Sequence, residues 1–228
     1  MEKAIPTTDG GDVATRIAQQ TLASRRAGYA EEVRRLLDAA LLVMQRCGTA
    51  SRPRVADIVA AAGLSNDAFY RHFPSKDALV TALLEDGQQR LTSYLAHQMA
   101  KEESAEEQVR RWVDGVLSQA MGEVAATTLA VLWNGASVVE GPASGRHFAS
   151  APLALLLHQP FAELGSADPQ LDASLAAHAV LGALSDHLWQ HTEPSAGEVE
   201  AVADCCLRIA GGGAGDRSPQ VTESTRST

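Results

Sequence analysis

Residues 53–79 read PRVADIVAAAGLSNDAFYRHFPSKDAL, and this stretch decides how the chain is organised. Its first half has apolar side chains at positions i, i+3, i+4 and i+7, which predicts one buried face of a short helix. These residues are Val55, Ile58, Val59 and Ala62. Gly63 ends that helix, Ser65 can cap a second one, and Pro74 closes the second helix. Two short helices joined by a glycine-containing turn form a helix-turn-helix, whose second helix enters the major groove of DNA.

The second helix separates into an inward and an outward face. Ala68, Phe69 and Phe73 are its natural inward positions, so the remaining side chains are candidates for reading DNA. These candidates are Ser65, Asn66, Asp67, Tyr70, Arg71 and His72. Ser75 can then cap a third helix that begins with Lys76, where helix dipole and charge together attract a phosphate.

Four short motifs in this region are correctly spaced for a known family. They are Asp57-Ile58, Ala62-Gly63-Leu64-Ser65, Phe69-Tyr70-Arg71-His72-Phe73 and Ser75-Lys76-Asp77-Ala78-Leu79. The stretch resembles the DNA-binding signature of the tetracycline-repressor (TetR) family of bacterial transcription regulators. The resemblance implies an all-helical homodimer with an N-terminal operator-binding domain and a C-terminal domain that binds a small effector. It also implies that Tyr70 and Lys76 hold phosphates, and that Ser65, Asn66 and Arg71 lie at or near the groove.

Two positions depart from the usual pattern of the family. Arg54, preceded by Pro53, stands where a threonine or serine is usual, and Arg54 is the eighth candidate DNA contact. Asp67 occupies a site that is more often small or basic, and its carboxylate would repel phosphate unless it accepts from a cytosine amino group. The alternative interpretation of the whole stretch is a small helical packing unit with no DNA partner.

Composition and charge favour packed helices with an unevenly charged surface. The 228 residues are 45% hydrophobic and only 4% aromatic, and no strict alternation suggests a sheet. The net charge is -9, yet residues 24–80 contain nine Lys or Arg against six Asp or Glu. Residues 91–228 contain seven against seventeen. A locally basic N-terminal region on an acidic remainder concentrates the attraction for phosphate where the helix-turn-helix lies.

The three cysteines indicate no disulfide framework, because Cys205 and Cys206 are adjacent and Cys47 is distant in the sequence. We expect no membrane partner and a cytoplasmic location, because no apolar signal segment or run of about 18 apolar residues is present.

We expect an all-α chain with an N-terminal three-helix domain and a C-terminal helical domain. The expected parts are a disordered tail at 1–23, a DNA-binding domain at 24–80, an effector-binding and dimerisation domain at 81–210, and a disordered tail at 211–228. The expected helices are Tyr29–Cys47 with Gly48 as a cap, a long helix from Ser75 to about Met99, one beginning after a Ser104–Glu107 capping box, 124–139, and 151–164 broken by Pro160. Two further helices, from Leu171 to Trp189 and over 199–209, are the expected dimer interface by resemblance to the family.

An effector pocket would be lined by large apolar side chains with a few polar groups. The candidates are Trp112, Trp133 and Phe148, with His147 or His178 to orient a ligand. Ordinary core packing is the alternative for each tryptophan. His187 and His191 have the i, i+4 spacing of a metal pair, but without a third ligand we expect a surface or interface pair, and no metal or cofactor.

No nucleophile elbow, phosphate-binding glycine loop or zinc-protease helix is found, so we do not expect an enzyme. The sequence predicts a ligand-responsive repressor that is released from palindromic double-stranded operator DNA by a small hydrophobic effector. The alternative is a helical small-molecule-binding protein or enzyme with a vestigial DNA-binding head. The sequence does not separate a repressor from an activator.

Overall fold

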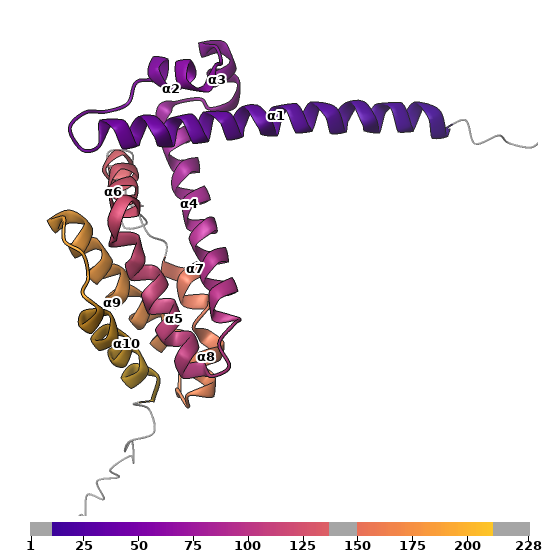
Figure 1. Cartoon of the computed structure of the whole chain (residues 1–228). Helices are drawn as coiled ribbons and strands as arrows, with labels where there is room; N and C mark the ends of the chain where they lie inside the picture. Colours follow the sequence, from indigo (N-terminus) through magenta and orange to yellow (C-terminus); the bar gives the residue numbers. More distant parts are fainter. Residues whose placement is uncertain (1–10, 137–149, 212–228) are drawn as a thin grey trace, which may run out of the picture. The chain divides into compact units, whose positions relative to one another are not determined.

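The computed structural model describes residues 11–136 and 150–211, and within these ranges it is helical, with no strand (Figure 1). This confirms the all-α class. The chain divides into two compact units, Met1–Leu79 and Val80–Thr228. Helix α4, Lys76–Met99, contributes its first turn to unit 1 and the rest to unit 2.

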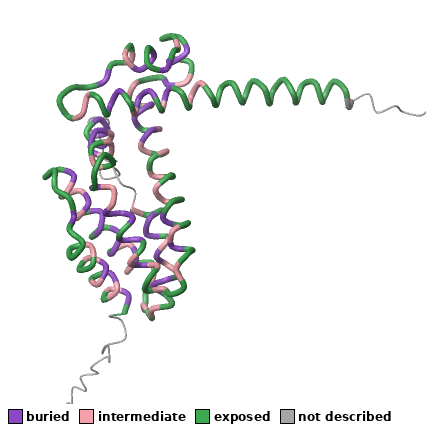
Figure 2. Tube along the Cα trace, viewed as in Figure 1, coloured by how far each residue is buried: buried purple, intermediate pink, exposed green. Residues whose placement is uncertain are grey.

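Helix α1, Gly11–Cys47, begins much earlier than the expected Tyr29. Its first half is solvent-exposed from Val13 to Glu31 (Figure 2), although the Tyr29 ring contacts His72. The sequence there lacks large buried side chains but is rich in alanine, glutamine and arginine, which are good helix formers. Local propensity therefore extends a helix whose second half is anchored by packing. The expected mobile tail at 1–23 thus differs from the structure at 11–23, and residues 1–10 lie outside the described residues.

The helix-turn-helix consists of α2, Val55–Ala62, and α3, Asn66–His72. Gly63 adopts a left-handed conformation with φ 62°, which makes the sharp turn that a side chain would strain. Ser65 accepts a hydrogen bond from the Ala68 N–H at 3.1 Å, as a helix N-cap does. The inward residues of both helices pack against α1. Those that are buried are Ile58, Val59, Ala62, Ala68, Phe69 and Phe73.

Unit 2 packs α5, Ala105–Leu117, against α9, Pro169–Gln190, and α10, Ala196–Gly211. Helix α5 begins with the predicted capping box: Ser104 accepts from the Glu107 N–H, and the Glu107 carboxylate accepts from the Ser104 N–H. Helix α9 begins with Asp168 as its N-cap. These local capping residues determine where α5 and α9 begin.

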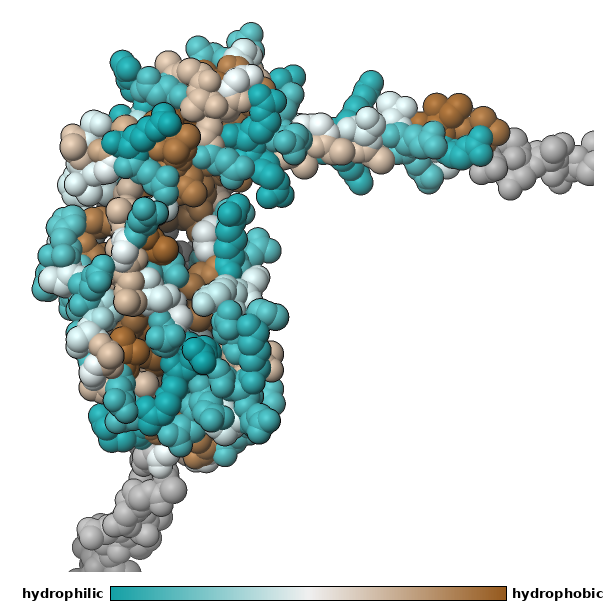
Figure 3. Space-filling model, in the orientation of Figure 1, coloured by the Kyte–Doolittle hydropathy of each residue, from teal (hydrophilic) through white to brown (hydrophobic). Residues whose placement is uncertain are grey.

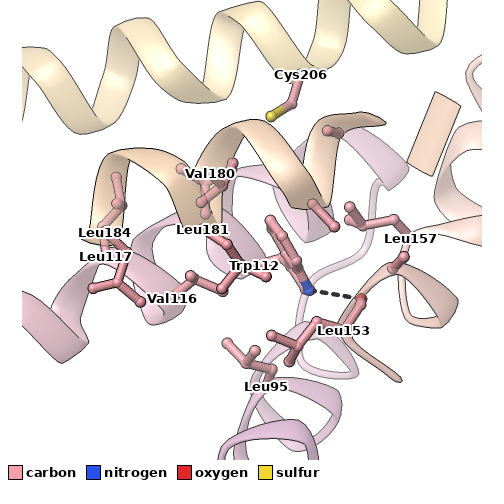
Figure 4. Packing of buried hydrophobic residues seen from close by; sticks show 14 of the residues in the cluster. Leu95, Trp112, Val116, Leu117, Leu153, Leu157, Val180, Leu181, Leu184 and Cys206 are labelled. Atoms are coloured by element: carbon pink, nitrogen blue, oxygen red, sulfur yellow. Dashed lines mark hydrogen bonds between the residues drawn. The ribbon is translucent and has the colours of Figure 1, made fainter. Parts of the chain in front are cut away.

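The core of unit 2 is centred on Trp112, which is fully buried (Figure 4). Its indole N–H donates to the Leu153 carbonyl at 3.1 Å, so the polar edge of the ring is satisfied inside an apolar environment. The same apolar cluster includes leucine, valine and alanine side chains of α4, α5, α7 and α9, and Phe161 of α8. This is ordinary core packing of a large aromatic residue.

Four further elements belong to the described part of unit 2. They are the 3-10 helix η1, Ser118–Ala120, and helices α6, Gly122–Ala136, α7, Ser150–Leu155, and α8, His158–Glu163. The break between α7 and α8 precedes Pro160, so the expected interruption at Pro160 is wrong. Pro160 lies in the first turn of α8, where proline is tolerated because no intrahelical N–H bond is required there.

No single helix among the described residues has both the length and the apolar composition for a membrane span. A pair of segments, Ala105–Ala120 and Gly122–Gly135, meets the criterion jointly, but the two are bent by 73°.

Candidate nucleic-acid interface

Helix α3 presents one solvent-exposed face, formed by Asn66, Asp67, Tyr70 and Arg71. Tyr70 is 57% exposed, so its side chain is accessible to a partner. Its ring packs edge-on against the buried Phe69, with centroids 5.2 Å apart. An aromatic ring fixed in this way can place a hydroxyl donor against a phosphate.

Ser65 and Asp67 also serve the helix itself. The Ser65 oxygen accepts from the backbone of α3, which leaves its O–H free to donate outward. Asp67 lies in the first turn of α3, where a carboxylate is favoured by the helix dipole. Both residues are exposed, so a contact with DNA remains compatible with their place in the structure.

Arg54 is paired with a carboxylate of its own helix. Its Nε and Nη2 donate to the two oxygens of Asp57 at 3.0 and 3.2 Å. This hydrogen bond lowers the pKa of Asp57 below its ordinary value and raises that of Arg54. Arg54 also precedes α2 without making a side-chain cap, and its side chain is 81% exposed. It can therefore reach a phosphate only by sharing or leaving Asp57.

Lys76 begins α4, and Ser75 caps this helix by accepting from the Ala78 N–H at 3.1 Å. The Lys76 ammonium donates to the Pro53 carbonyl at 3.5 Å, which orients the side chain toward the start of α2. A capped helix N-terminus next to a lysine provides both N–H groups and charge for an anion.

His72 does not belong to the exposed face, which corrects the sequence-based assignment. Its side chain is 1% exposed, and Nε2 lies 2.6 Å from Glu32 Oε2 of α1. The ring also contacts Tyr29, with centroids 4.2 Å apart. Helical spacing alone placed His72 outward, but α1 covers this end of α3 and buries the imidazole.

The expected ligand residues are not brought together. Trp112 is in the core, whereas Trp133 is 38% exposed and lies against Trp189 with ring centroids 6.0 Å apart. His178 is on the surface, where its ring is hydrogen-bonded to Ser150 and to the Ser174 carbonyl. Phe148 and His147 lie outside the described residues.

A different cavity, of about 110 Å³, lies among α4, η1, α6 and α7. Its walls are mainly leucine and valine, with Gln88, Gln119 and Thr128 as polar groups. Gly87, which the sequence marks only as a glycine inside a long helix, faces open space in this wall. Sequence reasoning missed the cavity because its lining comes from four elements that share no pattern.

A larger groove of about 610 Å³ runs between α5 and α10 and has charged walls. Its arginines are already paired: Arg110 with Glu106 and Asp204 at 3.0 and 2.8 Å, and Arg111 with Glu102 at 2.7 Å. Four carboxylates against two arginines leave this groove acidic, so the smaller apolar cavity is the better candidate for a hydrophobic ligand.

His187 and His191 are not arranged as a metal pair. His191 lies beyond the end of α9, with φ 54°. Both nitrogens of His187 are engaged, with Thr192 at 2.8 Å and Glu198 at 2.9 Å. No group of three potential metal ligands occurs in the described part of the chain.

Residues 36–83 match the family profile described as "Bacterial regulatory proteins, tetR family". This segment contains α2, α3 and every candidate DNA contact named above. No curated protein matches the sequence.

Several solved structures share the fold. A protein of Mesorhizobium loti MAFF303099 assigned to the TetR family superposes with a TM-score of 0.61 at 17% identity, over 80% of this chain and 96% of that one. A TetR-family transcriptional regulator of Pectobacterium atrosepticum gives 0.56 at 25% identity, over 80% and 91%. RolR in complex with resorcinol gives 0.57 at 16% identity, over 81% and 89%.

Proposed function

We propose that this protein, a member of the TetR family of DNA-binding transcription regulators, is a dimeric repressor that leaves its operator when a small hydrophobic effector binds. The observation that carries the proposal is the exposed face of α3, with Tyr70 and Arg71, beside the capped start of α4 at Lys76. Side chains of this kind bind phosphates and base edges, and a seven-residue helix fits within a major groove.

The DNA-binding step is tested with duplexes that the protein itself enriches from a random-sequence pool. Affinity for the enriched duplex falls steeply with salt, because phosphate contacts release counterions. Lys76→Ala weakens binding to all duplexes alike and reduces the salt slope by about 1. Lys101→Ala, which removes the same charge from unit 2, leaves the affinity for DNA and the salt slope unchanged. Equal effects of the two substitutions would contradict the assignment.

Dimerisation is proposed through one exposed stripe of α9. Leu171, Leu175 and Trp189 are 54%, 53% and 45% exposed and share this stripe with Ala179 and Gly182. Gly182 has open space around its Cα, so a second helix can approach closely there. Against the same stripe of a second copy these apolar side chains become buried, in a self-complementary two-fold interface.

Gly182→Arg tests this interface by placing a long charged side chain where a second helix would approach. We expect a monomer in sedimentation equilibrium and a large loss of operator affinity, because two half-sites are no longer bound together. Gln159→Arg on α8 adds the same charge elsewhere and leaves the dimer intact. A dimer that survives Gly182→Arg places the interface on another surface.

The effector site is proposed in the cavity beside α4. Its volume of about 110 Å³ is below the roughly 150 Å³ that accommodates benzene in an engineered protein cavity, so the expected occupant is no larger than a single small ring. RolR, which has a similar fold, is bound to the small aromatic molecule resorcinol. The same helix that lines this cavity begins at Lys76, so an occupant that shifts α4 would act on the last residues of the DNA-binding unit, Lys76 among them.

Gly87→Leu tests the effector step, because its side chain would occupy the open space beside Gly87. We expect operator binding to persist while the response to small aromatic compounds is lost. Gly28→Leu, also in open space but on the exposed half of α1, retains the response. An unchanged response in Gly87→Leu would exclude this cavity.

A further inference from the structure

Glu32 of α1 makes the contacts that hold the C-terminal end of α3. Its Oε2 lies 2.6 Å from His72 Nε2 and 3.4 Å from Arg71 Nη2. One carboxylate oxygen therefore contacts two successive residues of the recognition helix, one of them buried and the other on the exposed face. These residues are 39 and 40 positions away in the sequence, so the contact ties two distant elements together.

The surroundings of His72 are consistent with one hydrogen bond, from its Nε2 to Glu32. Because the carboxylate can only accept, Nε2 is the nitrogen that carries hydrogen in the bond. His72 Nδ1 is buried without a hydrogen-bond partner, so a donor on that side would be left unsatisfied. The hydrogen bond from His72 is the main cause that lowers the pKa of Glu32, and Arg71 and Arg35 add to it by charge. The carboxylate is thus held in its ionised, accepting form.

We propose that Glu32 is a positioning residue for DNA recognition, which fixes the reading angle of α3 through His72 and orients Arg71 before DNA is bound. The proposal rests on the proposed DNA-binding function. Helix α3 has only seven residues, so its own hydrogen bonds cannot hold its direction. The Ser65 cap fixes one end, and the Glu32–His72 bond fixes the other.

A carboxylate at this place also has a cost. Glu32 shares Arg71 with any incoming phosphate, and its side chain is 34% exposed beside the reading face. It therefore opposes binding to DNA of arbitrary sequence. Removing it raises non-specific affinity and lowers the preference for the operator, two changes of opposite sign that a general loss of folding does not produce.

The experiment compares two duplexes of equal length: one enriched by the wild-type protein from a random pool, and its scrambled counterpart. Binding to each is measured at one fixed salt concentration, and the ratio of the two affinities is the readout. We expect Glu32→Ala to lower the ratio at least tenfold, with scrambled-duplex affinity unchanged or increased. Glu31→Ala, which removes the neighbouring exposed carboxylate, keeps the ratio within twofold.

Further variants separate the hydrogen bond from the charge. Glu32→Gln removes the charge, so it raises the affinity for the scrambled duplex. It keeps an oxygen that accepts from His72, so it retains most of the ratio of the two affinities. His72→Phe keeps a ring against Tyr29 and loses the bond, so it lowers the ratio as Glu32→Ala does. The ratio for the Glu32→Ala/His72→Phe double variant is then no lower than the lower of the two single-variant ratios, because both substitutions remove the same Glu32–His72 hydrogen bond. His72→Gln, which can still donate to Glu32, partly restores the ratio.

The outcomes distinguish this inference from the function on which it rests. If the wild-type protein enriches no sequence, the DNA-binding proposal fails, and this inference fails with it. If it enriches one, but Glu32→Ala and Glu32→Gln keep the ratio within twofold, Glu32 does not position α3. Since Glu32 is at the surface, its variants remain folded and decide the question even if His72→Phe unfolds.

Discussion

In unit 1 charged side chains of α1 reach across to the short helices: the Arg35 guanidinium donates to the Ala62 and Gly63 carbonyls, and the Glu32 carboxylate accepts from His72. In unit 2 the helices are joined mainly by buried apolar side chains around Trp112. The difference follows from size. Helices of seven and eight residues bury little apolar surface, so polar contacts help to fix their ends, whereas α5 and α9 of unit 2 are longer and contribute many side chains to one apolar core.

The two units also expose different kinds of surface. On α3 the exposed side chains are polar or charged around Tyr70, while one exposed stripe of α9 carries Leu171, Leu175 and Trp189 among a few polar residues. Figure 3 shows how hydrophobic and hydrophilic residues are distributed over one face of the molecule. A polar surface suits a charged, hydrated partner, and an apolar one suits a second copy of the chain.

Among these substitutions we expect Trp112→Ala, in the core of unit 2, to cause the largest loss of stability. Removing a fully buried tryptophan costs about 3–5 kcal/mol of unfolding free energy, because a cavity remains where the ring was. Urea denaturation followed by circular dichroism measures the loss. Trp133→Ala, at a site that is 38% exposed, serves as the control and loses much less. Equal losses would mean that Trp112 does not anchor the core.

A smaller change in stability is expected from substituting two glycines of unit 2, Gly115 and Gly87. In Gly115→Ala the new Cβ would lie 2.4 Å from the buried Leu95 Cδ2, and such overpacking costs about 1–3 kcal/mol. Gly87→Ala meets open space and stabilises by roughly 0.5–1 kcal/mol, because alanine favours a helix more than glycine does. Thermal unfolding of both variants gives shifts of opposite sign. A loss in both would contradict the open space beside Gly87.

In unit 1 we expect Ser65→Ala to cost about 1 kcal/mol, since it removes the cap of α3. Ser65→Asp retains an oxygen that can accept from the Ala68 N–H and stays close to wild type. Chemical denaturation monitored at unit 1 measures the difference. If aspartate is as damaging as alanine, the serine acts through something other than the cap.

The smallest expected effect is a dependence of stability on pH, which arises from Glu32 in unit 1. The pKa of Glu32 is lowered on folding by the hydrogen bond from His72, so its contribution is fully present above the ordinary pKa of 4.5 and is lost as the pH falls through the lowered value. The difference in unfolding midpoint between wild type and Glu32→Gln therefore shrinks from pH 7 to pH 3. A constant difference would mean that the charge of Glu32 contributes nothing.

Features set by neighbouring residues were predictable from the sequence. The Ser65 cap, the Ser104–Glu107 capping box and the left-handed Gly48 depend on side chains within three or four positions, and all three are confirmed. The family signature fixed the helix-turn-helix in the same way, because its residues are contiguous.

Features set by distant residues were not predictable. The burial of His72 depends on α1, which has no sequence signal pointing to α3. The apolar cavity depends on how four elements meet, and Pro160 lies in the first turn of α8 because the chain already turns before His158. Trp112 was proposed for a pocket because an aromatic residue suits both a core and a ligand site, and only packing decides between them.

The exposed half of α1 has a kinetic consequence. An isolated helix of this length is marginal in water, and every residue from Val13 to Gly28 is solvent-exposed here. Its amide hydrogens should therefore exchange with deuterium far faster than those of the same helix after Leu36, where packing protects the backbone. Trypsin should likewise cleave first at Arg16, Arg25 or Arg26 and leave a shortened chain that still unfolds cooperatively.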